Sequence, residues 1–278
     1  MPTAKTEGAE MGRCEGKVAL ITGAARGQGR SHALRLAEEG ADIIAIDICR
    51  DYDTVAYPLA TPDELRETVA AVEALDRRIV AREADVRDDQ AVQAAVQEAV
   101  AELGRLDVVV ANAGICTVQA WNEVTPQVWR DTIDTNLTGV WNTCVHAAPH
   151  LIEAGGGSMI LTSSTAGLKG MPFVGPYVAA KHGVVGIMRL LALELGQHSI
   201  RVNTLHPTGV DTPMGAMNVA LEPLLDANPE LAPLFMNALP VDLTETRDQS
   251  NAVLFLASDE SRYVTGLEMK VDAGYTLR

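Results

Sequence analysis

The chain has 278 residues, of which 37 are acidic and 22 basic, so its formal net charge is −15. Hydrophobic residues make up 47% and charged residues 21%, which excludes an intrinsically disordered chain and leaves enough apolar side chains for a sizeable core. The acidic balance argues against a nucleic-acid partner or an anionic membrane surface, because both recruit proteins through clustered Lys and Arg. A small-molecule ligand or substrate is therefore a better expectation than a nucleic acid or a membrane.

The amino-terminal residues and the cysteines indicate where the protein works. Residues 1–16 lack the apolar run of a signal peptide, and no stretch of about 18 apolar residues could span a bilayer. The four cysteines are too far apart for a disulfide-dense framework or a paired metal site. We therefore expect reduced thiols, a cytoplasmic protein, a flexible tail over residues 1–16 and one domain over residues 17–278.

Short strands rich in Ile, Val and Leu alternate with helices along that domain. The expected strands are residues 17–22, 42–47, 79–84, 106–111, 158–162, 200–206 and 268–271. The expected helices are residues 28–39, 62–76, 88–103, 126–154 (broken by Pro149), 175–196 and 244–258. This alternation predicts an α/β fold in which a doubly wound, seven-stranded parallel sheet carries helices on both faces.

Two connections are longer than such units need. Residues 49–61 form an extended βα connection, and residues 208–242 form a long excursion that contains Pro and Met. Loops of this length in a compact domain are usually functional. We expect the first to be an insertion near the site and the second to be a substrate lid.

A glycine-rich turn, TGAARGQG at residues 22–29, follows the first strand. Gly23, Gly27 and Gly29 would let the backbone approach a pyrophosphate that rests on the amino end of the next helix, with Arg26 and Gln28 between them. The alternative is an ordinary glycine-rich βα turn. Its position after the first strand of an alternating chain favours dinucleotide binding.

The TGxxxGxG spacing resembles the short-chain dehydrogenase/reductase family, and further family motifs follow in order from residue 16 to residue 274. They are Asn112-Ala-Gly114, Asn136, Ser164 and Tyr177-Val-Ala-Ala-Lys181. The resemblance implies a single Rossmann-type domain that binds a nicotinamide cofactor and oxidises or reduces a CH–OH group. It also implies a catalytic tetrad of Asn136, Ser164, Tyr177 and Lys181.

Asp47, at the end of the second strand, decides between the two nicotinamide cofactors. A carboxylate there can accept hydrogen bonds from the adenosine ribose and repels a 2′-phosphate, which favours NAD. Arg26 and Arg50 argue for the phosphorylated cofactor, but an uncompensated like charge in a partly dehydrated site is costly. We therefore expect NAD.

The resemblance assigns the remaining cofactor contacts. Asp85 and Val86 correspond to adenine contacts, although the segment could equally cap the helix that follows. Asn112, Ala113 and Gly114 correspond to the adenosine side. Pro207, Val210 and Thr212 correspond to the segment that holds the nicotinamide carboxamide, with Tyr177 and Lys181 beside it. The family more usually reads Pro-Gly where this chain has Thr208 between Pro207 and Gly209.

Tyr177 and Lys181 are four residues apart on a predicted helix, so their side chains share one face. A nearby ammonium lowers the pKa of a phenol, which would make Tyr177 a usable general base. Ser164 would clamp the substrate oxygen, and Asn136 would order a water linked to Lys181. Without Ser164 the same spacing would indicate only a helix face.

Substrate contacts are expected from residues 115–121, residues 165–174 and the apolar side chains of the lid, namely Met214, Met217, Phe235 and Met236. They favour a hydrophobic secondary alcohol or ketone, or alternatively they pack a subunit interface. His146, His150 and Glu153 have a metal-like spacing, but no further ligand pattern supports a site, so no metal is expected.

The insertion and the HPTGVDTPM stretch resemble the mycofactocin-associated, carveol dehydrogenase-like subgroup of the family. This resemblance implies tightly bound NAD that an external redox carrier reoxidises, and family surfaces imply a homotetramer. Two other functions stay open: a lyase or epimerase on the same scaffold, and a non-catalytic NAD-binding protein.

Overall fold

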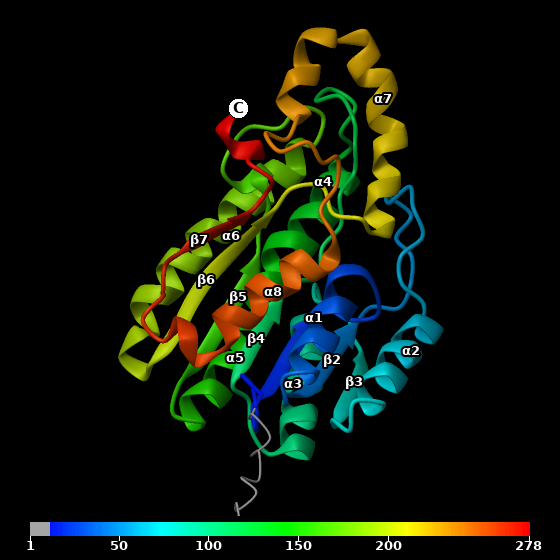
Figure 1. Cartoon of the computed structure of the whole chain (residues 1–278). Helices are drawn as coiled ribbons and strands as arrows, with labels where there is room; N and C mark the ends of the chain where they lie inside the picture. The colour runs from blue at the N-terminus through cyan, green and yellow to red at the C-terminus, as the bar shows by residue number, and fades with distance from the viewer. Residues whose placement is uncertain (1–11) are drawn as a thin grey trace, which may run out of the picture.

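In the computed structural model, which describes residues 12–278, seven parallel strands form one sheet (Figure 1). The strands are β1 (Val18–Thr22), β2 (Asp42–Asp47), β3 (Ile79–Glu83), β4 (Val108–Ala111), β5 (Gly157–Thr162), β6 (Ile200–Pro207) and β7 (Glu268–Val271). Their order is β3-β2-β1-β4-β5-β6-β7, so the winding direction reverses between β1 and β4. The predicted doubly wound parallel sheet is confirmed.

Helices cover both faces of the sheet. They are α1 (Gly27–Ala37), α2 (Pro62–Glu73), α3 (Asp89–Leu103), α4 (Pro126–Ile133), α5 (Gly139–Glu153), α6 (Gly175–Glu194), α7 (Asn218–Ala227) and α8 (Thr246–Ala257). Helices α3, α5 and α6 pack on one face, and α1, α2 and α8 pack on the other. Successive residues of β1 point to opposite faces, with Leu20 among the first group and Ile21 among the second. Burial on both faces explains why the strands read as continuous apolar runs.

The amino-terminal segment differs from the expected tail where the structure describes it. Residues 1–11 of that expectation lie outside the described residues. Residues 13–16 form a turn against the end of α1, in which the Cys14 side chain is fully buried and its N–H donates to the Glu39 carbonyl at 2.8 Å. The N–H of Arg13 donates to the Glu39 carboxylate at 3.0 Å. A single cysteine in an otherwise polar segment is too weak a pattern to predict this packing from the sequence.

The helix expected over residues 126–154 is interrupted by a π-helical turn, Asp134–Thr138, between α4 and α5. The side-chain amide of Asn136 donates to the Thr132 carbonyl at 2.9 Å, which is the acceptor that an α-helix reserves for the backbone N–H of residue 136. This competition shifts the local register. Pro149 does not break α5, which continues to Glu153.

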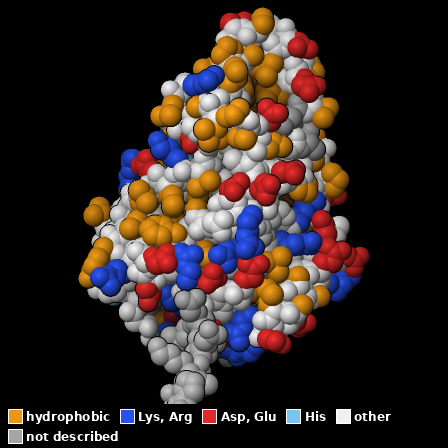
Figure 2. All heavy atoms as spheres, in the orientation of Figure 1, with side chains coloured by type: hydrophobic (Ala, Val, Ile, Leu, Met, Phe, Trp, Pro, Cys, Tyr) orange, Lys and Arg blue, Asp and Glu red, His pale blue; other side chains and the backbone are white. Residues whose placement is uncertain are grey.

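The lid, residues 208–242, contains the 3₁₀ turn Pro213–Met217, α7 and the 3₁₀ segment Pro229–Phe235. It stands beyond the carboxyl ends of the strands, with α7 at the upper right of Figure 1. In the same orientation, Figure 2 has hydrophobic side chains gathered over this end of the molecule. The insertion, residues 49–61, contains no helix or strand. Within residues 12–278, no helix is both long and apolar enough to cross a membrane.

Candidate active site

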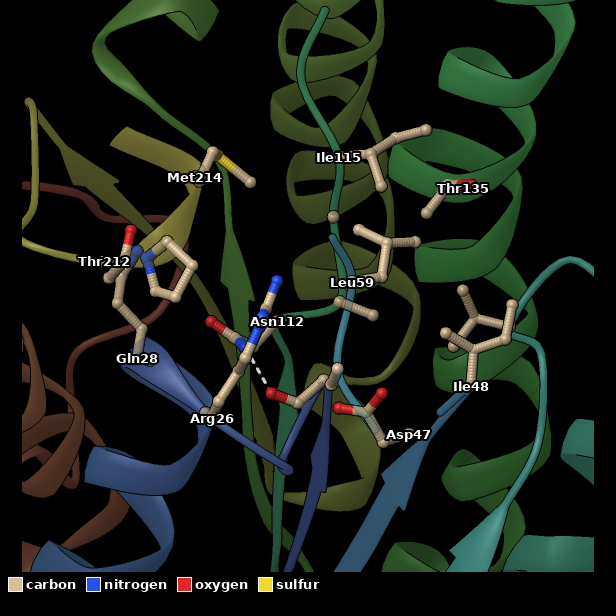
Figure 3. A pocket seen from close by; sticks show the side chains of 18 of the residues that line it. Arg26, Gln28, Asp47, Ile48, Leu59, Asn112, Ile115, Thr135, Thr212 and Met214 are labelled. Atoms are coloured by element: carbon tan, nitrogen blue, oxygen red, sulfur yellow. Dashed lines mark hydrogen bonds between the residues drawn. The ribbon is translucent and has the colours of Figure 1, made fainter. Parts of the chain in front are cut away.

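A cleft opens at the carboxyl ends of β1, β2 and β4, where the winding reverses and where α/β sheets bind ligands. Its volume is about 880 Å³, including the part open to solvent. We call it the cofactor cleft. Its lining contains the predicted residues Gly23, Arg26, Gly27, Gln28, Gly29, Asp47, Val86, Asn112, Ala113, Gly114 and Thr212. In Figure 3, Arg26 and Asp47 lie at one end of the cleft, and Ile115 and Met214 lie at the other.

Two glycines of the turn, Gly23 and Gly29, leave no room for a Cβ. Gly23 has a positive φ of 68°, and a Cβ built on it would lie 3.0 Å from the Cα of Ala113. A Cβ on Gly29 would lie 1.9 Å from the Gly23 carbonyl oxygen. The first turn of α1 has no acidic side chain and no side-chain cap, so its amino end remains available to an anionic group. These features fit a pyrophosphate.

The carboxylate of Asp47 is buried at the far end of the cleft, with 7% of the residue exposed. It accepts hydrogen bonds from the backbone N–H groups of Ala25 at 2.9 Å and Cys49 at 3.2 Å. Burial raises its pKa, and these hydrogen bonds oppose the rise. Asp47 is therefore fixed between the glycine turn and the insertion, in the position expected of a ribose acceptor.

The two basic side chains that argued for a phosphorylated cofactor have other partners. The Arg26 guanidinium donates to the Pro58 carbonyl and lies 3.7 Å from the Glu64 carboxylate. The Arg50 guanidinium pairs with Asp85 at 3.2 Å. Both cations thus already have acidic or carbonyl partners in this arrangement.

Asp85 and Val86 have different surroundings. Val86 lines the cofactor cleft, but Asp85 does not. The Asp85 carboxylate accepts from Arg87 at 2.8 Å and from the Tyr52 hydroxyl at 3.1 Å. Burial alone would raise the pKa of Asp85, but the hydrogen bonds from Arg87 outweigh it and lower the value. The side chain of Asp85 therefore braces the insertion, and the expected adenine contact of that side chain has no support here.

The segment after β4 is held close to the glycine turn by Thr22, the last residue of β1. The N–H groups of Asn112 and Ala113 donate to the Thr22 hydroxyl at 3.0 and 3.1 Å, and the Asn112 amide donates to the Thr22 carbonyl at 3.0 Å. A Cβ on Gly114 would lie 2.7 Å from the Asn136 side-chain oxygen. The segment after β4 is therefore held closely between Thr22 and Asn136.

A second cavity, of about 1320 Å³ including its open part, lies beneath the lid. We call it the substrate cavity. Most of the exposed area of its lining is apolar. The predicted residues that line it include Ser164, Tyr177, Lys181, Pro207, Val210, Thr212, Cys116, Val118, Thr165, Met171, Val174, Met214, Met217 and Phe235. It joins the cofactor cleft through shared lining residues, namely Gln28, Asn112, Gly114, Thr212 and Met214.

Ser164 and Tyr177 lie together at the wall of the substrate cavity. Ser164 follows β5 and caps a 3₁₀ turn, with its hydroxyl accepting from the Ala166 N–H at 3.1 Å. Burial raises the pKa of the Tyr177 phenol and the Cys116 thiol adds to the rise, while hydrogen bonding with Ser164 lowers it. The two hydroxyls can therefore contact one substrate oxygen.

Lys181 lies one helical turn beyond Tyr177, with its ammonium nitrogen 5.4 Å from the centre of the phenol ring. It donates to the Thr162 carbonyl at 2.7 Å and is only 2% exposed. Burial lowers the pKa of Lys181 to about 8. Burial of the Tyr177 phenol therefore opposes the lowering of its pKa that is expected from Lys181, whose ammonium is directed at a backbone carbonyl.

Asn136 is fully buried behind these groups, in the π-helical turn. Its side-chain oxygen accepts from the Ile115 N–H at 3.0 Å, and its amide donates to the Ile115 carbonyl at 2.9 Å. The side chain is thus occupied in fixing the segment after β4. The expected water-ordering role would have to be carried by other atoms of this turn.

Some predicted contacts lie elsewhere. Met236 is 52% exposed and Trp121 is 89% exposed, and neither lines the substrate cavity. Thr208, where the family usually has glycine, donates from its hydroxyl to the Asn237 side-chain oxygen at 3.0 Å. The substitution thus adds a contact within the lid. His146 pairs with Asp89 at 2.7 Å, and the described residues hold no group of three or more His, Cys, Asp or Glu that could bind a metal.

Two features of the site were missed from the sequence. His206, fully buried at the end of β6, contacts the Ser164 carbonyl at 2.7 Å through Nδ1 and the Thr204 hydroxyl at 2.8 Å through Nε2. Tyr57 of the insertion accepts from the Cys116 N–H at 3.1 Å. A polar residue inside an apolar strand could have indicated the first. Nothing in the sequence pattern indicates the second.

Comparisons with known proteins agree with this geometry. A family model described as enoyl-(acyl carrier protein) reductase matches residues 23–276. The chain is 58% identical to a Mycolicibacterium smegmatis protein named as a short-chain type dehydrogenase/reductase, over 96% of this chain and 99% of that protein. The chain therefore belongs to the short-chain dehydrogenase/reductase family.

Two further relatives have names that specify a substrate. The chain is 53% identical to (-)-trans-carveol dehydrogenase of Rhodococcus erythropolis, over 96% of this chain and 100% of that protein. It is also 53% identical to a carveol dehydrogenase from Mycobacterium avium whose crystal structure is a complex with NAD. That structure superposes with a TM-score of 0.91 and covers 96% of this chain and 100% of its own.

Proposed function

We propose that this protein is an NAD-dependent dehydrogenase that interconverts a hydrophobic secondary alcohol and its ketone. The observation that carries the proposal is the placement of Ser164, Tyr177 and Lys181 on a mostly apolar cavity that joins the cofactor cleft. The similarity to two carveol dehydrogenases over nearly the whole chain supports the same activity and an alcohol of that kind.

NAD is the cofactor that the cleft fits. The glycine turn and the amino end of α1 would hold the pyrophosphate, and Asp47 would accept from the ribose hydroxyls. Val86 and the 112–114 segment would contact the adenosine side, and the segment from Pro207 to Thr212 would hold the carboxamide. When bound, NAD supplies the acceptor for the hydride that leaves the carbinol carbon.

The protein's own residues handle the proton. In the oxidative direction, the phenolate oxygen of Tyr177 takes the alcohol proton as general base, and the Ser164 hydroxyl donates a hydrogen bond to the substrate oxygen. Lys181, one turn away, would stabilise the phenolate. Burial raises the pKa of the Tyr177 phenol, so the phenolate has to form against desolvation. Asn136 fixes the backbone in front of Lys181 and completes the tetrad as a positioning group.

The insertion supports tight retention of NAD. It contributes Tyr52, Tyr57 and Leu59 to the lining of the cofactor cleft, and these side chains pack with Ile115. Retained NAD would have to be reoxidised in place, so an external redox carrier such as mycofactocin is the expected second partner. The reaction would take place in the cytoplasm.

A homotetramer is the expected assembly. Helices α5 and α6, which cover the same face of the sheet, carry exposed apolar side chains, among them Trp141, Val145 and Leu193. Isolated exposed hydrophobic residues are common, but several of them on two helices of the same layer favour a subunit contact.

A panel of secondary alcohols and ketones, carveol included, tests the function. The protein is purified, its bound nucleotide is identified by mass spectrometry, and absorbance of reduced NAD is followed with each compound. We expect copurified NAD that is reduced by at least one alcohol. An absence of redox change with every compound, together with turnover of a substrate by elimination or epimerisation, would favour a lyase or epimerase instead. Binding of NAD without turnover of any kind would favour a non-catalytic protein.

A further inference from the structure

Tyr57 connects the insertion to the active site. Its side chain is 7% exposed, and its hydroxyl oxygen accepts a hydrogen bond from the Cys116 N–H at 3.1 Å. The two residues are 59 positions apart in the chain. The hydrogen bond therefore ties a cover of the cofactor cleft directly to the loop over residues 115–121, which faces the substrate cavity.

Cys116 itself borders the catalytic groups. It is 2% exposed and lines the substrate cavity together with Tyr177 and Lys181. The preceding residue, Ile115, is held through both its N–H and its carbonyl by the side chain of Asn136. The start of this loop thus has two anchors: Asn136 from the helix layer and Tyr57 from the insertion.

Other hydrogen bonds of the insertion go to different parts of the molecule. Thr54 donates from its hydroxyl to the Asp131 carboxylate on α4 at 2.8 Å, and Tyr52 donates to Asp85 at 3.1 Å. The Pro58 carbonyl accepts from Arg26. These contacts hold the insertion over the cleft, whereas the contact of Tyr57 reaches the substrate side.

We propose that Tyr57 is a positioning residue for the reaction, because its hydrogen bond to Cys116 couples closure of the insertion to assembly of the active site. Opening of the insertion breaks this bond and releases the start of the 115–121 loop from the face of Tyr177 and Lys181. The insertion would then be part of the catalytic arrangement as well as a cover for NAD. The kinetic part of this inference rests on the proposed dehydrogenase function.

The test compares Tyr57→Phe with Thr54→Val in the full-length, NAD-loaded protein. Each substitution removes one hydroxyl with which the insertion contacts another segment, and Thr54 lines neither the cleft nor the substrate cavity. Alkylation of Cys116 by iodoacetamide is followed by peptide mass mapping, with the buried Cys14 and Cys144, which lie outside the insertion, as internal references. Burial raises the pKa of the Cys116 thiol to about 12, so labelling reports transient exposure of that thiol.

Loss of one neutral hydrogen bond should speed labelling of Cys116 by between about threefold and tenfold in Tyr57→Phe. Labelling of the reference cysteines should stay unchanged, and kcat for the best alcohol should fall by a similar factor with little change in KM. Thr54→Val should change neither quantity. Equal labelling of Cys116 in the two variants and the wild type would overturn the coupling, and so would a Tyr57→Phe protein with wild-type kcat. Labelling needs no substrate, so it tests the contact even if the alcohol panel refutes the dehydrogenase activity.

Discussion

At the scale of single residues, the site combines groups that burial pushes toward their neutral forms. Burial raises the pKa of the Tyr177 phenol and lowers the pKa of the Lys181 ammonium to about 8. Proton transfer therefore depends on how these two groups and Ser164 are held against a substrate oxygen. A phenylalanine ring at position 177 has no hydroxyl and therefore cannot take part in the proton transfer.

Tyr177→Phe should therefore abolish turnover and leave NAD binding nearly intact, because the ring still fills its place but offers no proton acceptor. Steady-state kinetics with the best alcohol and a titration of apoprotein with NAD measure the two effects. Tyr263→Phe, at a tyrosine that is 89% exposed, is the matched control and should behave as wild type. Substantial residual kcat in Tyr177→Phe would refute its assigned role.

Asp47 should give the protein a preference for NAD. We expect NAD to bind at least about tenfold more tightly than NADP, or about 1.4 kcal/mol, because the buried carboxylate would repel a 2′-phosphate. Asp47→Asn should narrow this gap. Glu83→Gln is the control, since Glu83 is the neighbouring acidic residue on β3 but is exposed and does not line the cleft. Calorimetric titration of each protein with NAD and with NADP measures the preference. Tighter binding of NADP than of NAD to the wild type would contradict the role assigned to Asp47.

At the scale of elements, the hydrophobic pattern of the sequence was sufficient to predict the strands and most helices. This worked because buried parallel strands alternate regularly with amphipathic crossover helices along the chain. The π-helical turn could not be predicted, since it depends on where the Asn136 amide finds its acceptor. The contacts of the insertion could not be predicted from the sequence either. Its residues have no periodicity, and the partner of Tyr57 is far away in the sequence. The site motifs, in contrast, could be recognised because their spacing within elements is fixed.

The interface between α1 and α8 contains a buried histidine that should make the free energy of unfolding depend on pH. His32 is fully buried, and its Nδ1 contacts the Ser250 hydroxyl at 2.8 Å. That hydroxyl also lies 2.9 Å from the Thr246 carbonyl and 2.7 Å from the Ser31 hydroxyl, whereas the buried Nε2 of His32 has no partner. Burial lowers the pKa of His32 to about 3.

The folded pKa of His32 lies below its unfolded value of 6.5, so the unfolded state binds more protons between these values. Its contribution to stability is complete above pH 6.5 and is lost as the pH falls toward 3, by about 1.4 kcal/mol per pH unit. His32→Asn keeps a donor for Ser250 and removes the titration. Urea unfolding between pH 7 and pH 4 should give this variant the shallower dependence, and exposed His198→Asn should match the wild type. Equal slopes in all three proteins would contradict the assignment.

At the scale of the whole molecule, apolar residues on α5 and α6 identify the surface that the proposed tetramer would use. Trp141, Val145 and Ile152 are 40%, 39% and 39% exposed, and their spacing along α5 places them on one side of that helix. Leu190 and Leu193 extend the apolar surface on α6, at 43% and 84% exposed. Contact between copies through these helices would bury all five side chains.

A charge placed in this row should therefore break the assembly. Val145→Glu would bury an unpaired carboxylate at the contact, a cost of several kcal/mol that each symmetric copy repeats. Leu75→Glu is the matched control, because Leu75 is also 39% exposed but follows α2 on the opposite face of the sheet. Sedimentation equilibrium should give a tetramer for the wild type and for Leu75→Glu, and smaller species for Val145→Glu. A tetrameric Val145→Glu protein would place the subunit contact on another surface, and a monomeric wild type would rule out the tetramer itself.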